Sequence, residues 1–197
     1  MELIKTIITA LFVTAVTENV IFSRGLGAST LVIISRDKRN IAGFSLCISY
    51  MSVFTSVLTW AIEQNFSDDI HYRYYKAIFY ASILCMVYFV SLMLGWTFMK
   101  KRSSTIKRYL NFSAFNCAVM GIMLMSSGVC VKLSDYVLYG LGSGLGYSAA
   151  LYYLSAVYKR LYSDKVPAAF RGFPLMMIYI GILSMALFGL TGYQMPF

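Results

Sequence analysis

Apolar residues run along this chain in long tracts that are separated by short polar joints. The tracts occupy roughly residues 6–34, 41–62, 77–99, 109–131, 136–158 and 173–195. About twenty apolar residues cross the hydrocarbon of a bilayer as one helix, so the pattern predicts six transmembrane helices. No joint is long enough for a separate soluble domain, and no repeat of about 20 to 50 residues is visible. We therefore expect one all-α transmembrane domain over residues 1–197.

The first tract is too long for a single straight span. Residues 6–34 would form a helix of roughly 43 Å at about 1.5 Å per residue, whereas the hydrocarbon core is about 30 Å thick. Gly25 and Gly27 lie inside this tract, where glycine weakens a helix and permits positive φ. We predict a break near Gly25–Ser29, because interrupted helices are where membrane proteins place their sites. The alternative is a tilted helix whose last turns leave the membrane.

The composition of the chain also indicates a membrane protein. Of its residues, 59% are hydrophobic and 13% charged, against about 25% charged in soluble domains. The mean hydropathy is +0.68. The first tract lacks a basic region and a small-residue cleavage site, so we expect no cleaved signal peptide. The composition predicts a multi-pass integral membrane protein.

The net charge of +9 could suggest nucleic acid as a partner, but the positions of the charges exclude that interpretation. Lys and Arg gather in short joints, which is the pattern that sets orientation in a membrane. If the N-terminus is outside, twelve of them lie on the inner side and four on the outer side. The inner set is Arg36, Lys38, Arg39, Lys100, Lys101, Arg102, Lys107, Arg108, Lys159, Arg160, Lys165 and Arg171. We predict that both termini lie outside.

Four polar residues stand inside apolar tracts and are candidates for function. Glu18 and Arg24 are expensive at that depth and usually face a bundle interior or water. They are too far apart in sequence to pair as neighbours on one helix, so we expect each to meet another helix or another subunit. Asn19 and Asn116 can bridge helices, a contribution of about 1 kcal/mol or less. A small secondary transporter with Glu18 and Arg24 in its pathway is one interpretation of this set.

The fifth tract contains "YGLGSGLGY", with glycine at Gly140, Gly142, Gly144 and Gly146. A phosphate-binding loop would need a preceding strand and a Lys-Ser/Thr pair, and neither is present. Small residues let helices approach closely in lipid, so we predict tight helix packing here.

The cysteines Cys47, Cys85 and Cys130 carry no recognisable ligand motif. No C-x-x-C spacing occurs, which argues against a zinc or thioredoxin-like site. We expect these three to be small buried hydrophobic residues.

Four segments together resemble one family of membrane subunits along nearly the whole chain. They are "ENVIFSRGLGAST", "NFSAFNCAVMG", "YGLGSGLGY" and "DKVPAAFRG" with the later "GILSMALFGLTG". The family is the six-span subunits shared by the Rnf complex and the sodium-pumping NADH:quinone reductase, Nqr. The chain is most similar to the RnfA and NqrE members of that family. The resemblance implies a bacterial or archaeal cytoplasmic (inner) membrane protein with both termini outside.

The same resemblance implies an inverted repeat, with halves of about 1–99 and 100–197. Spans one and four would be broken near the midplane. In such subunits a Leu-Gly-x-Cys motif and an Asn-Cys-Ala motif supply two ligands to a 2Fe-2S cluster. A homologous subunit of opposite orientation supplies the other two ligands. The cluster passes electrons across the membrane for ion pumping, and other subunits carry flavin and iron-sulfur centres.

This chain keeps one of the two motifs and alters the other. Asn116 and Cys117 match Asn-Cys-Ala, while Gly27 and Ser29 occupy the glycine and cysteine places of Leu-Gly-x-Cys. The resemblance therefore implies Cys117 and Ser29 as ligands, beside Gly27 and Asn116. A serine hydroxyl resists deprotonation far more than a thiol does, and it is a harder donor to iron.

Three interpretations follow from the sequence. The chain is a redox subunit with a weak ligand at Ser29, a paralogue that keeps the fold without the cluster, or the small transporter. It has no flavin-attachment or nicotinamide motif, so we do not expect an isolated enzyme. Under the first interpretation it is one subunit of a redox-driven ion translocase.

Overall fold

Every regular element in the described part of the chain is helical. The computed structural model describes residues 2–35, 41–66, 70–98, 103–161, 163 and 166–191. The elements in chain order are α1 Glu2–Phe12, the π-helical turn η1 Val13–Thr17, α2 Val20–Arg24, α3 Ala28–Ser35, α4 Ile41–Phe66, α5 Ile70–Phe98, α6 Ser103–Ala114, α7 Cys117–Val129, α8 Leu133–Leu161 and α9 Phe173–Thr191. The all-α prediction is confirmed for these residues.

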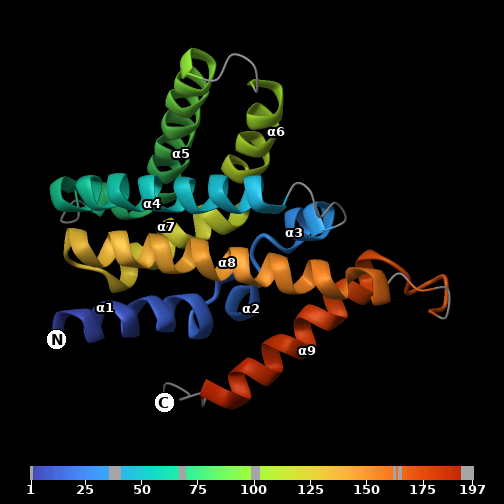
Figure 1. Ribbon diagram of the computed structural model, residues 1–197. Coiled ribbons are helices and arrows are strands. Elements are labelled where there is room, and N and C mark those ends of the chain that lie inside the picture. The colour runs from blue at the N-terminus through green and yellow to red at the C-terminus, as the bar shows by residue number, and fades with distance from the viewer. Residues whose placement is uncertain are drawn as a thin grey trace.

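The long helices α4 and α8 lie side by side and form the centre of the molecule (Figure 1). The first helix, α1, and the turn η1 pack along the other side of α8, and α7 packs against α4 and α8. In Figure 1, α9 crosses this stack at an angle, and α5 and α6 project from it together. The short segments α2, α3 and α7 each contact α8 as well.

The glycines of α8 allow its backbone to approach helices on two opposite sides. A Cβ at Gly144 would lie 2.8 Å from Ser49 Cα on α4, and Gly140 meets the same helix. A Cβ at Gly142 would lie 1.7 Å from Thr14 Oγ1, and Gly146 also meets η1. The predicted close packing of the glycine run is confirmed, because a side chain at any of these positions would collide with a neighbour.

Three hydroxyl residues of α4 are buried, and each donates a hydrogen bond to the preceding turn of the same helix. Ser52, Thr55 and Thr59 are fully buried. Thr55 Oγ1 donates to Met51 O at 2.7 Å, and Thr59 Oγ1 donates to Thr55 O at 2.8 Å. Such bonds to the preceding turn keep small polar residues compatible with a buried helix.

A carboxylate joins the last turn of α4 to α5. Lys76 Nζ lies 2.9 Å from Glu63 Oε1, and the Tyr72 hydroxyl donates to the same oxygen at 3.0 Å. The Tyr80 hydroxyl donates to it as well. Three side chains of α5 thus donate to the carboxylate of Glu63, and together they fix the connection between α4 and α5.

The apolar tracts became helices, but the number of membrane spans stays a prediction. By length and composition, Ile4–Arg24, Ile41–Phe66 and Tyr74–Thr97 are able to cross a membrane. The bent pair Lys107–Ala114 and Cys117–Val129 adds a fourth candidate. Helix α9 contains a shorter apolar stretch, and α8 is not among the candidates. The described helices therefore account for three or four of the six predicted spans by this measure.

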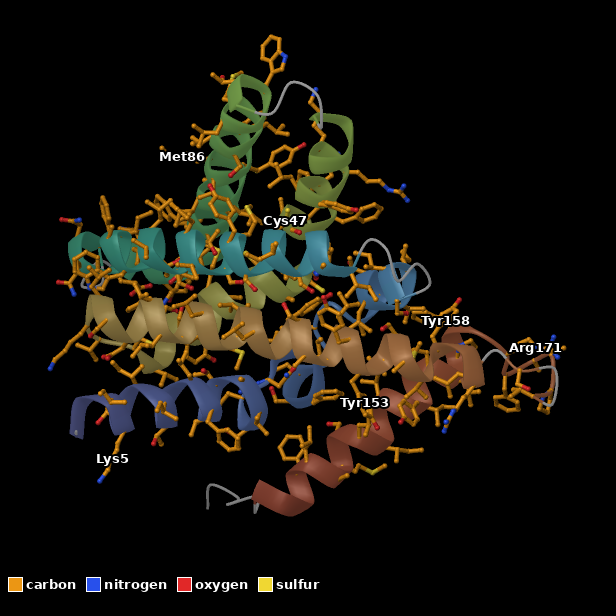
Figure 2. The ribbon with its side chains drawn as sticks, viewed as in Figure 1. Lys5, Cys47, Met86, Tyr153, Tyr158 and Arg171 are labelled. Carbon is orange, nitrogen blue, oxygen red and sulfur yellow. The ribbon has the colours of Figure 1, made fainter. Side chains whose placement is uncertain are left out.

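Figure 2 shows how one side chain of α8 meets α9: Tyr153 points from α8 toward the final helix. Its hydroxyl lies 2.9 Å from the Tyr179 hydroxyl, and the two rings stack with centroids 6.3 Å apart. Side chains rather than backbone contacts therefore connect these two helices here.

The prediction of three buried structural cysteines is wrong for Cys85. Cys47 and Cys130 are half-buried, whereas Cys85 is exposed on α5. The arm formed by α5 and α6 stands away from the stack, so much of the surface of α5 has no protein neighbour.

We predict that Gly144→Ala lowers the free energy of unfolding by about 1 to 3 kcal/mol, the usual cost of an extra group in a packed interior. In the matched variant Gly181→Ala on α9, the new Cβ would meet no atom within 4 Å. We expect its free energy of unfolding to rise slightly, because alanine favours a helix over glycine. Thermal unfolding in detergent measures both. Equal stability of the two variants would contradict the close approach of α8 to α4.

Candidate functional site

Two features interrupt the chain between α1 and α3, the π-helical turn η1 and the capping of α2 by Asn19. The turn η1 shifts the hydrogen bonding so that Glu18 N donates to Val13 O at 2.9 Å. Asn19 then caps α2, where its Oδ1 accepts from Ile21 N at 3.0 Å and its Nδ2 donates to Ala15 O at 2.9 Å. The irregular segment therefore begins earlier than the break predicted near Gly25–Ser29, because it already starts before α2.

The short helix α2 ends where the sequence predicted a break. Gly25 has φ +68° and caps α2 in the left-handed conformation, and Gly27 has φ +80°. Glycine adopts such angles without the clash that a Cβ causes. Ser29, placed inside the predicted break, is the second residue of α3.

The second interruption separates α6 from α7, which is bent 49° from it. Asn116 lies at the break, and its Oδ1 accepts from Ala118 N at 3.0 Å as the cap of α7. Cys117 is the first residue of α7. The cap satisfies a backbone N–H that the helix itself leaves without a partner.

The two interruptions use the same residue in the same way. Asn19 and Asn116 each accept from the backbone N–H two residues later at 3.0 Å. They lie about half the chain apart. Cys117 directly follows its capping asparagine, whereas Ser29 lies beyond α2, in the first turn of α3.

The structure brings the two predicted motifs into direct contact. Gly27 N donates to Cys117 Sγ at 3.0 Å. Asn116 Nδ2 donates to the Tyr147 hydroxyl at 3.0 Å, and that hydroxyl donates to Gly27 O at 3.0 Å. Gly27, Asn116 and Cys117 thus form one hydrogen-bonded junction, and α8 completes it through Tyr147.

Gly27 fits this junction because it has no side chain. A Cβ there would lie 2.7 Å from Asn116 Oδ1, 2.7 Å from Tyr147 Cε2 and 2.9 Å from Ala118 Cβ. Next to it, Leu26 packs so closely on α7 that a Cβ at Gly121 would lie 2.3 Å from Leu26 Cδ1. The loop after α2 is therefore seated against the first turn of α7.

Both predicted ligand side chains are accessible in this chain. Cys117 is exposed although its neighbours Asn116 and Ala118 are buried, and Ser29 is exposed on α3. Among the described residues, no three His, Cys, Asp or Glu side chains form a group that could hold a metal ion. The structure therefore shows an exposed thiol at Cys117 and an exposed hydroxyl at Ser29.

Glu18 and Arg24 border the same hollow beside this junction. The cavity measures about 480 Å³ and also contacts Leu26, Gly121 and the later turns of α7. The Tyr139 hydroxyl of α8 donates to Glu18 Oε2 at 3.2 Å. Glu18 therefore meets another helix, while Arg24 is exposed at the end of α2.

Sequence reasoning missed Tyr147 as a residue of the site. The chain has sixteen tyrosines, and this one ends the segment "YGLGSGLGY", from which only close helix packing was predicted. Its partners are about 30 and 120 residues away in sequence. Its position on a buried helix face was the available signal, since a buried phenol needs a hydrogen-bond partner.

These features define a class of protein. It is a helical membrane protein in which two interrupted helices meet around a cysteine, and a glycine-lined helix supports them both. The chain belongs to the Rnf-Nqr family: the family described as "Rnf-Nqr subunit, membrane protein" matches residues 7–194.

Several bacterial relatives cover almost the same length. The RnfA-type subunit of the ion-translocating oxidoreductase complex of Azoarcus sp. (strain BH72) is 30% identical over 184 residues, 91% of this chain and 93% of the relative. The corresponding protein of Buchnera aphidicola subsp. Baizongia pistaciae is 31% identical over 88% of this chain and 90% of the relative. Its counterpart in the Na(+)-translocating ferredoxin:NAD(+) oxidoreductase complex of Acetobacterium woodii is 26% identical over 99% of this chain and 100% of the relative.

We predict that Gly27→Ala destabilises the chain more than Gly25→Ala does. Both residues have positive φ, which costs alanine about 1 to 2 kcal/mol, but a Cβ at Gly25 meets nothing within 4 Å. Crowding at Gly27 should add about 1 to 3 kcal/mol. Chemical unfolding of both variants in detergent measures the difference, and equal losses would contradict the crowded junction.

Proposed function

We propose that this chain is a membrane subunit of an Rnf-like ion-translocating oxidoreductase complex in the cytoplasmic membrane. In that role it passes electrons across the membrane through a 2Fe-2S cluster. The names of its relatives support the complex. The observation that carries the redox role is the junction in which Gly27 N–H donates to the sulfur of an exposed Cys117.

The matched interruptions support an inverted repeat of two halves. Asn19 and Asn116 cap equivalent helices with the same hydrogen bond, and each half contains one interrupted helix. We place both interruptions near the midplane, with six spans in all and both termini outside. Non-helical backbone at that depth requires protein neighbours, and α8 provides them through Tyr147.

The donor set fits a cluster that is shared between two subunits. A 2Fe-2S cluster takes four ligands, usually thiolates, and we assign Cys117 and Ser29 to it from this chain. A homologous subunit of opposite orientation supplies the remaining two. When bound, the cluster supplies one-electron transfer by a change in the iron oxidation state.

The protein groups around these ligands have separate tasks. The Asn116 cap fixes the start of α7 and therefore the direction of Cys117. The Gly27 N–H donates to the ligand sulfur and stabilises the negative charge on it. The Ser29 oxygen is a harder donor than sulfur, so we expect a lower reduction potential than a fourth thiolate would give.

The exposed hydroxyl of Ser29 also favours a second candidate function. In that case the chain keeps the fold and the complex but binds no cluster, and its role is structural or regulatory. Under the redox role, electrons reach and leave this subunit through other subunits with flavin and iron-sulfur centres. The two candidates differ in iron content and not in membership of the complex.

We predict that the anaerobically purified complex loses iron and acid-labile sulfide when Cys117 is replaced by Ala. A ligand thiolate cannot be replaced by a methyl group, so the visible and EPR signals of one 2Fe-2S cluster should disappear. The control is Cys85→Ala, because Cys85 is exposed on α5 and no ligand role is assigned to it. Equal iron in the wild type and Cys117→Ala would overturn the cluster assignment.

Ser29→Cys separates the two candidates. If the wild type binds a cluster, the variant should keep the same iron content and show a higher reduction potential, because sulfur is the softer ligand. If the wild-type complex contains no such cluster and the variant gains its spectrum, the cluster-free role is correct. A fully assembled wild-type complex without the cluster overturns the redox role.

We predict that both termini are accessible from outside the cell. Single cysteines are placed at either end of a chain whose other exposed cysteines are removed, and intact cells are treated with a membrane-impermeant maleimide. Both positions should react without permeabilisation, as the distribution of Lys and Arg requires. Labelling only after permeabilisation would contradict the proposed orientation.

A further inference from the structure

The Tyr147 hydroxyl connects the two interrupted helices to each other. It accepts from Asn116 Nδ2 and donates to Gly27 O, each at 3.0 Å. Tyr147 is 1% exposed, and Asn116 is 2% exposed. Buried hydrogen bonds of this kind are costly to lose, because no water replaces the missing partner.

Gly27 is held at both ends of its backbone. Tyr147 fixes its carbonyl, and its N–H points at Cys117 Sγ at 3.0 Å. The positive φ and the lack of space for a Cβ restrict the residue further. The direction of the N–H toward sulfur therefore depends on the hydroxyl of Tyr147.

We propose that Tyr147 is a positioning residue. Its hydroxyl keeps the Gly27 N–H on the Cys117 sulfur and thereby raises the reduction potential of the iron-sulfur group that Cys117 binds. The redox part of this proposal rests on the proposed function. Hydrogen bonds to ligand sulfurs stabilise the reduced, more negative state of an iron-sulfur group, and so they raise its potential.

The hydroxyl and the ring of Tyr147 have separable roles. The ring packs near Phe44, with centroids 6.1 Å apart, and against the position of a Gly27 side chain. Phenylalanine keeps these contacts but leaves Gly27 O and Asn116 Nδ2 without their partner. If only the ring mattered, Tyr147→Phe would change neither the hydrogen exchange at Gly27 nor the reduction potential.

The test compares Tyr147→Phe with Tyr139→Phe in the intact complex. Both tyrosines are buried on α8, but the hydroxyl of Tyr139 donates to Glu18 instead of the junction. Hydrogen-deuterium exchange of the peptide that contains Gly27 measures the junction without requiring a metal. We expect exchange about fivefold to tenfold faster in Tyr147→Phe, the effect of losing one buried hydrogen bond, and no change in Tyr139→Phe.

Asn116→Ser provides a second variant that keeps a capping side chain. Serine is a good helix cap, but it lacks the amide N–H that donates to Tyr147. Faster exchange at the Gly27 peptide is expected here as well. Unchanged exchange in both Tyr147→Phe and Asn116→Ser, at normal folding and assembly, overturns the positioning role.

Redox titration monitored by EPR measures the effect of Tyr147 on the reduction potential. The potential of the cluster should fall in Tyr147→Phe and stay constant in Tyr139→Phe. Faster exchange with an unchanged potential overturns the redox effect and retains the positioning role. A wild-type complex without an iron-sulfur signal refutes the proposed function and the redox effect together, while the exchange experiment still decides whether Tyr147 positions Gly27.

Discussion

Interrupting a helix leaves backbone groups without their partners in that helix, and this constraint organises the molecule. Each side of the interruptions finds its partners within the chain. Asn19 Nδ2 donates to Ala15 O, the Ser184 hydroxyl of α9 donates to Phe22 O, and Tyr147 donates to Gly27 O. Helices α8 and α9 thus stabilise the broken segments, and the cysteine is presented from a junction whose polar groups are already paired.

The sequence predicted the helices and the close approach of α8 better than the contacts around the interruptions. The excess length of the first apolar tract and its glycines located the break that ends α2, and alternating glycines predicted the close approach of α8. The π-helical turn before Glu18 was missed, because no residue type marks a one-residue shift in hydrogen bonding. The role of Tyr147 was missed for a different reason, since it depends on partners that only the folded chain brings together.

The exposure of Cys117 and Ser29 connects the fold to assembly. Each side chain faces outward beside buried neighbours, whereas an unreactive core cysteine would face inward. One thiol and one hydroxyl cannot complete a four-ligand iron site. Under the proposed redox role the site would therefore belong to two subunits, because this chain offers at most the Cys117 thiol and the Ser29 hydroxyl.

The glycines of α8 have a mechanical consequence. Because Gly140 and Gly144 meet α4 while Gly142 and Gly146 meet η1 on the opposite side, turning α8 about its own axis would drive side chains into two backbones at once. Helix α9, whose contact with α8 includes the Tyr153–Tyr179 pair, has no such obstruction there. Rotation of α8 against α4 and η1 is therefore obstructed on two sides, and we expect these three elements to move together.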